Sequence, residues 1–216
     1  MTQPPVLRGG PAVRSVSLLL GLFLFSVGLV LQLESGLGLP PWDVLNQGLA
    51  AHTPLSFGQA NVGVSLCVLA LAAALGARIG LGTVANAVLI GLFVDLLLTL
   101  DWVDGLAEAS LGARIAMLLG GIAIVGLGSG FYLGAAFGAG PRDSLMVIAG
   151  QRTGRRLGIV RGAIEVPVAA LGFALGGTVG IGTVLFAFGV GFAVEAGCAA
   201  LVRVGVAESG GRIAAA

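Results

Sequence analysis

Six long apolar runs constrain this chain more than any other feature of its sequence. They lie at residues 15–33, 58–75, 81–100, 115–133, 158–175 and 181–201. A helix needs about 20 apolar residues to cross a bilayer core of about 30 Å, and each run has roughly that length. Only 10% of the residues are charged, far fewer than in water-soluble domains. We therefore expect an all-α integral membrane protein with six transmembrane helices in a lipid bilayer.

Charge, cysteine and histidine content argue against several functional classes. The net charge of +1 offers no basic surface for nucleic acid. Cys67 and Cys198 lie in different apolar runs without a CxxC motif, which argues against a disulfide framework or a thiolate metal site. His52 is the only histidine, and no HExxH, GxSxG or P-loop motif occurs. We expect no enzyme, no metal and no cofactor.

The placement of the arginines predicts the orientation of the chain, because positive residues near span ends prefer the cytoplasmic side. With the N-terminus inside, ten arginines fall on or near the cytoplasmic face: Arg8, Arg14, Arg78, Arg142, Arg152, Arg155, Arg156, Arg161, Arg203 and Arg212. Only Arg114 falls outside, and the acidic segment 101–108 forms an external loop. Residues 1–13 and 203–216 are then a cytoplasmic N-terminal segment and a cytoplasmic tail.

An internal repeat divides the rest of the chain. After a shift of 100 residues, positions 14–95 match positions 114–195 at 25 of 82 places, against about one in nine expected from composition. The matches include Arg14 with Arg114, Pro41 with Pro141, Asp43 with Asp143, Thr53 with Thr153, Gly58 with Gly158, and GxGTV at 80–84 with 180–184. Each repeat, 14–113 and 114–202, holds three spans. Since three is odd, the second repeat must be inverted, an arrangement typical of secondary transporters.

Each repeat also contains a short helix candidate between its first two spans, at 43–51 and 143–150. At 1.5 Å per residue neither segment can cross the membrane. An aspartate just after a proline is a good signal for a helix start. We interpret the two segments as re-entrant or interfacial half-helices at opposite membrane faces, with Asp43 and Asp143 as helix caps rather than ligands.

The motifs around these half-helices carry a family resemblance. The sequences GLGLPPWDVLNQGL at 36–49 and GAGPRDSLM at 138–146 contain a duplicated GxGPxDxL pattern, in which the first copy has Leu39-Pro40 where the second has Ala139-Gly140. With these motifs the chain resembles the YczE/YyaS/YitT group of bacterial integral membrane proteins, and is most like its YczE branch. The resemblance implies a bacterial plasma-membrane protein. It names no substrate and carries over no catalytic residue.

Arg161 and Glu165 form one candidate site inside the membrane. Glu165 lies about 10 Å into its span and is the deepest acid of the sequence. Arg161 precedes it by four residues, the spacing of a same-face ion pair. The repeat aligns these residues with Asn61 and Ser65, so this helix face is polar in both copies but charged in one. The pair fits either a site for a charged solute or a structural salt bridge.

Asp95 and Glu195 form a second candidate set, because acids inside spans are costly and usually face a cavity or a partner. The inversion places Asp95 in the outer half of the membrane and Glu195 in the inner half. They fit paired gates or ion ligands, or structural acids that snorkel to the interface or hold a loop amide.

Two functions remain open. The first is a small secondary transporter or exporter of a polar or charged solute, which works by alternating access between the inverted repeats. The second is a membrane accessory, scaffold or regulatory protein that transports nothing. Six helices and two half-helices are few to enclose a cavity alone, which favours a homodimer.

Overall fold

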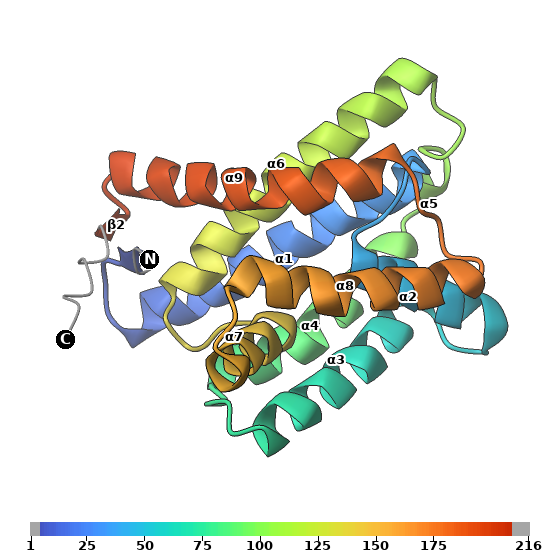
Figure 1. Ribbon diagram of the computed structural model, residues 1–216. Coiled ribbons are helices and arrows are strands. Elements are labelled where there is room, and N and C mark those ends of the chain that lie inside the picture. The colour runs from blue at the N-terminus through green and yellow to red at the C-terminus, as the bar shows by residue number, and fades with distance from the viewer. Residues whose placement is uncertain (1–4, 209–216) are drawn as a thin grey trace.

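The computed structural model describes residues 5–208, so the outer parts of the N-terminal segment and of the tail, with Arg212, lie outside the described residues. Within this range the chain is almost entirely helical. The helices are α1 (Pro11–Ser35), α2 (Pro41–His52), α3 (Phe57–Ala74), α4 (Leu81–Leu98), α5 (Asp101–Asp104), α6 (Leu111–Gly134), α7 (Pro141–Thr153), α8 (Leu157–Ala174) and α9 (Ile181–Arg203). Strands β1 (Val6–Leu7) and β2 (Ala207–Glu208) pair antiparallel, at the end of the bundle opposite α5 (Figure 1).

Six helices of the described chain, namely α1, α3, α4, α6, α8 and α9, are long and apolar enough to cross a membrane. Each begins and ends within about four residues of a run identified in the sequence. The prediction of six helices long and apolar enough to cross a membrane is therefore confirmed. Helices α2 and α7, of 12 and 13 residues, occupy the places of the two short candidates. The sequence did not predict α5, β1 or β2, which are only two to four residues long.

Proline and glycine set the bounds of the short helices. Pro41 and Pro141 stand at the first position of α2 and α7, where a missing backbone N–H costs nothing. Gly38 and Gly138 precede them with φ of 115° and 120°, a backbone conformation that favours glycine. The same residues thus build the same turn in both halves of the chain.

The centre of the molecule is the contact between α1 and α6, which cross in Figure 1. A Cβ built on Gly21 would lie 2.7 Å from the carbonyl oxygen of Gly128, and a Cβ on Gly28 would lie 2.6 Å from that of Gly121. Because the residue numbers run in opposite directions, the two helices are antiparallel. Their backbones touch without intervening side chains, as small residues allow in membrane helix pairs.

The contacts around this crossing come in pairs that are 100 residues apart. Arg14 Nε donates to the carbonyl oxygen of Ala135 (2.9 Å), and Arg114 Nε donates to that of Ser35 (2.6 Å). Each arginine therefore lies at the start of one central helix and neutralises the carbonyl end of the other. The backbone N–H groups of Gly82 and Gly182 likewise donate to Phe137 and Leu37, both at 2.8 Å.

One pair of contacts breaks this pattern. Helices α3 and α4 pack together at Gly58 and Gly91, where a Cβ on either glycine would collide with the carbonyl oxygen of the other. The aligned glycines of α8 and α9, Gly158 and Gly191, have no atom of another element within 4 Å of a Cβ position. The two halves thus differ here: α3 and α4 are closed on each other, and α8 and α9 are apart.

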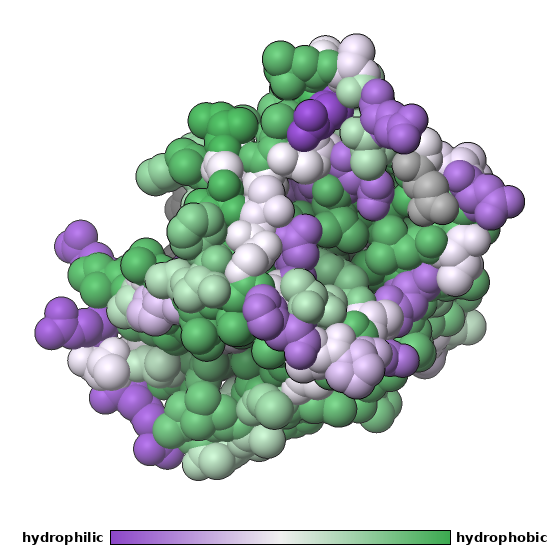
Figure 2. Space-filling view, turned by 90° about the vertical axis from the view of Figure 1, so that its right-hand side faces the viewer, coloured by the Kyte–Doolittle hydropathy of each residue, from purple (hydrophilic) through white to green (hydrophobic). Residues whose placement is uncertain are grey.

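The surface of the bundle is largely apolar. Phe188 and Phe192 on α9 are 77% and 75% exposed, and Val166 on α8 is 69% exposed. Hydrophobic residues also cover much of the face in Figure 2, with hydrophilic groups scattered among them. Such a surface is expected where helices face lipid rather than water.

The central crossing predicts opposite effects for two neighbouring glycines of α6. Gly121→Ala pushes a methyl group into the Gly28 carbonyl, and should destabilise the protein by about 1–3 kcal/mol. Gly120→Ala meets nothing within 4 Å and should leave stability unchanged or raise it by up to about 1 kcal/mol. Thermal unfolding of both variants in the same detergent measures the difference, and equal shifts would contradict the close crossing.

Candidate functional site

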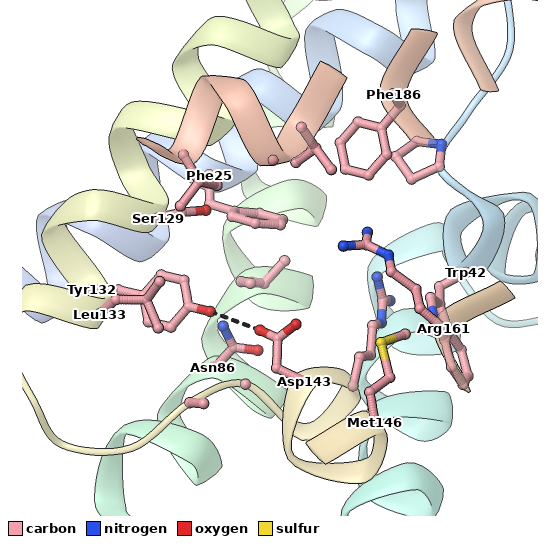
Figure 3. A pocket seen from close by; sticks show the side chains of 18 of the residues that line it. Phe25, Trp42, Asn86, Ser129, Tyr132, Leu133, Asp143, Met146, Arg161 and Phe186 are labelled. Carbon is pink, nitrogen blue, oxygen red and sulfur yellow. Dashed lines mark hydrogen bonds between the residues drawn. The ribbon is translucent and has the colours of Figure 1, made fainter. Parts of the chain in front are cut away.

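A cavity of about 710 Å³ lies between α8 and α9 and reaches the starts of α2 and α7. All eight long and short helices of the two halves contribute to its wall, while α5 does not. Its volume lies within the range of small-molecule sites in proteins. Figure 3 shows side chains from several helices converging on this space.

The starts of α2 and α7 meet in an ion pair at the wall of the cavity. Asp43 on α2 is 1% exposed, and its Oδ1 accepts from Arg142 Nη2 at 3.3 Å. The same oxygen accepts from the amide groups of Asn46 (2.9 Å) and Asn61 (3.3 Å). The guanidinium of Arg142 also lies over the ring of Trp42, 5.6 Å from its centroid. The buried carboxylate is thus neutralised by a residue of the other half of the chain.

Asp143, which aligns with Asp43, has a different environment. Its Oδ2 accepts a hydrogen bond from the hydroxyl of Tyr132 on α6 (3.1 Å), drawn as the dashed line in Figure 3. Its side chain is exposed to the cavity. The N-cap positions of α2 and α7 are Pro40 and Gly140, and among the described residues neither aspartate side chain accepts a backbone N–H of its helix. The interpretation of both residues as caps is wrong, because their carboxylates bind other side chains instead.

Arg161 and Glu165 form the ion pair that their spacing indicates. Arg161 Nε donates to Glu165 Oε1 at 3.0 Å, and Glu165 is 8% exposed. Both residues line the cavity, as do Asn61 and Ser65, the residues that align with them on α3. The polar faces of α3 and α8 therefore reach the same space.

The two acids near the ends of α4 and α9 have different surroundings. Asp95 does not line the cavity: it accepts from the backbone N–H of Gly58 (2.7 Å) and from the hydroxyl of Ser56, at the start of α3. Glu195 is exposed and lines the cavity. Asp95 binds the first turn of α3, which is a structural role, while Glu195 faces open space.

Of the seven candidate residues from the sequence, the cavity gathers six: Asp43, Asn61, Asp143, Arg161, Glu165 and Glu195. Sequence reasoning missed Trp42, Tyr132 and Arg142 as members of this wall. Arg142 entered only as a marker of orientation. The repeat held a usable signal, because positions 42 and 142 lie beside the matched aspartates and both carry large side chains able to stack.

Comparison with known proteins identifies the family of this chain. Residues 12–197 match the family described as a family of unknown function, DUF6198. The chain belongs to this family. Its relatives include an uncharacterised protein of Haemophilus influenzae, 40% identical over 184 residues, which are 84% of this chain and 82% of the relative. Two proteins of Bacillus subtilis also match: the uncharacterised membrane protein YczE, 32% identical over 77% of each chain, and the uncharacterised protein YyaS, 30% identical over 77% of this chain and 83% of its own.

No solved structure matches this DUF6198 chain. The resemblance to the YczE and YyaS proteins is confirmed, and the chain is a membrane protein with several apolar helices. These relatives are uncharacterised, so the function of the site is inferred from its own geometry.

The Asp43–Arg142 pair predicts a non-additive double mutant. Arg142→Met leaves an unpaired carboxylate in a buried position and should destabilise the protein by about 2–3 kcal/mol. Adding Asp43→Asn removes that charge and should restore most of the loss. Thermal or denaturant unfolding of the single and double variants measures the coupling.

The exposed pair Arg8–Glu208 supplies the control, because its side chains are 61% and 66% exposed. Arg8→Met should cost about 0.5 kcal/mol or less. If Arg142→Met and Asp43→Asn lower stability additively, Asp43 does not depend on Arg142 for its charge.

Proposed function

We propose that this protein is a small secondary transporter built from two inverted repeats, residues 14–113 and 114–202. The antiparallel crossing of α1 with α6 supports the inversion, because the two helices occupy equivalent places in the repeats. The paired bonds of Arg14 and Arg114 support it too. In such a fold a site between the halves opens alternately to the two sides of the membrane.

The observation that carries this proposal is the difference between the two halves. The first repeat is closed at Gly58 and Gly91, and the second is open at Gly158 and Gly191, although all four glycines match in the repeat. Two copies of one unit in two arrangements are what alternating access requires. The cavity lies on the open side, and six of the candidate residues line it.

The contact of α3 with α4 in the closed half shows which contact α8 and α9 would make if the open half closed. Where α3 meets α4, Asp95 binds the N–H of Gly58 at the start of α3. When α8 moves onto α9, Gly158 meets Gly191 and Glu195 reaches the start of α8 in the same way. Opening of α3 from α4 would then release Asp95 toward the other side. The solute needs only to bind the two arrangements with different affinity to shift their populations.

The proposed topology places both chain ends in the cytoplasm of a bacterium, at its plasma membrane. Reporter fusions after Arg155 should then show a cytoplasmic position, and fusions within 101–108 an external one, because the arginines near α7 and α8 resist translocation. The cavity would open toward the cytoplasm. Finding both fusion sites on the same side of the membrane would exclude the inverted repeat.

A leucine at Gly191 tests alternating access directly. Gly191→Leu should fold normally in the open arrangement, since nothing lies near this position, but should block the approach of α8. Gly189→Leu is the matched control, because Gly189 is equally open and Leu89 already occupies the aligned place in α4. A reporter cysteine at Val194, which lines the cavity, or at its aligned residue Val94, which is buried, reports access.

These cysteines are compared in proteoliposomes, in a background without Cys67 and Cys198, with a membrane-impermeant thiol reagent added to one side at a time. In the parent protein we expect Val194→Cys and Val94→Cys to react from opposite sides. Gly191→Leu should leave only Val194→Cys reactive, while Gly189→Leu should leave both patterns intact. If Val94→Cys never reacts from either side in the parent protein, the first repeat does not open. The accessory or scaffold function then replaces the transporter.

A further inference from the structure

We propose that the cavity binds a cationic solute with an apolar body, either a protonated amine or a quaternary ammonium ion. This inference rests on the proposed function, since it takes the cavity between α8 and α9 as the solute site. Two independent features of the wall support it: its balance of charge and its aromatic side chains.

The charges of the wall do not cancel. Among the described residues that line the cavity, four carry carboxylates and two carry guanidinium groups. Arg142 pairs with Asp43, and Arg161 pairs with Glu165. Asp143 and Glu195 remain outside the ion pairs of the described chain. The wall therefore offers two carboxylates with no arginine bound to them.

Tyr132 makes Asp143 the central acid of this site. The tyrosine hydroxyl donates to Oδ2 of Asp143 and so fixes the carboxylate without cancelling its charge. The second oxygen, Oδ1, accepts no hydrogen bond from a side chain of the described residues, and Asp143 lines the cavity. An ammonium group beside it would gain a charge-assisted contact in surroundings of low dielectric.

Aromatic rings line the same space and suit the same ligand. Phe25, Trp42, Tyr132 and Phe186 all contribute to the wall, and Figure 3 shows them around the cavity with Asp143 among them. The faces of such rings attract cations, most strongly when both are shielded from water. Ile90, Leu133 and Val190 add an apolar surface for the body of the solute.

An anion fits this wall poorly. The guanidinium groups that would receive it are already paired with Asp43 and Glu165, so neither offers an uncompensated positive charge. The anion would also meet the negative charges of Asp143 and Glu195. The wall therefore selects for positive charge rather than for polarity in general.

Tetraphenylphosphonium and tetraphenylborate test this choice, because the two ions have nearly the same shape and opposite charge. Equilibrium dialysis uses the purified full chain in detergent micelles, with empty micelles as the blank. Tetraphenylphosphonium should bind saturably and tetraphenylborate should not. Asp143→Asn should weaken tetraphenylphosphonium binding about tenfold or more, because it removes the unpaired charge but keeps the Tyr132 contact.

Two further variants keep the test decisive. Glu195→Gln alters an exposed side chain without an ion-pair partner in the described chain, so it should fold and should also weaken binding. Glu208→Gln removes an exposed acid that does not line the cavity and should bind as the parent does. Saturable binding of tetraphenylborate, absent binding of tetraphenylphosphonium, or parental affinity in both Asp143→Asn and Glu195→Gln would overturn the proposal.

The result of this binding experiment does not depend on the result of the transport test. Thiol access at Val94 and Val194 is measured without any solute. If access alternates while tetraphenylphosphonium does not bind, the transporter stands and the cationic solute is wrong. If the ion binds but access never alternates, the site is a cation-binding pocket in a protein that does not transport.

Discussion

The close antiparallel crossing of α1 and α6 is the constraint on which the other elements depend. Gly21 lies against Gly128 and Gly28 against Gly121, so the two helices meet backbone to backbone. No hydrophobic force drives helices together inside lipid, and packing at small residues is what holds them. The crossing brings the end of each central helix beside the start of the other. The turns that follow, at Gly38 and Gly138, then aim α2 and α7 toward each other across the centre.

The sequence predicted the helices well because their signals are local. Length and apolarity identified the six spans, and a proline followed by an aspartate located α2 and α7. The repeat even explains an exception to the arginine pattern: Arg114 aligns with Arg14 and binds the carbonyl end of α1. The matched glycines could not show which half is open. Gly58, Gly91, Gly158 and Gly191 are the same in both copies, so these positions do not distinguish the halves.

The site was predictable only where the residues in contact are close to each other in the sequence. The four-residue spacing of Arg161 and Glu165 indicated their ion pair. Asp43 and Arg142 are 99 residues apart, and only the meeting of two helix starts places them together. The interpretation of Asp43 as a helix cap did not indicate this pair, because it gave the carboxylate a partner in its own helix. The cavity also lies within one chain. Six long helices and two short ones therefore line it without a second copy, and the homodimer stays a prediction.

On the proposed mechanism, two contacts act as gates: the first is that of α3 with α4, and the second is that of α8 with α9. The residues that differ between these two gates explain which of them is open. The closed gate uses Ser56 and Asp95, two short side chains that bind at the start of α3. The aligned residues, Arg156 and Glu195, are longer and both carry charge. Closing the second gate would immobilise two flexible side chains for an exposed ion pair, which contributes about 1 kcal/mol or less. The second gate is therefore the weaker of the two, which agrees with its being the open one in this structure.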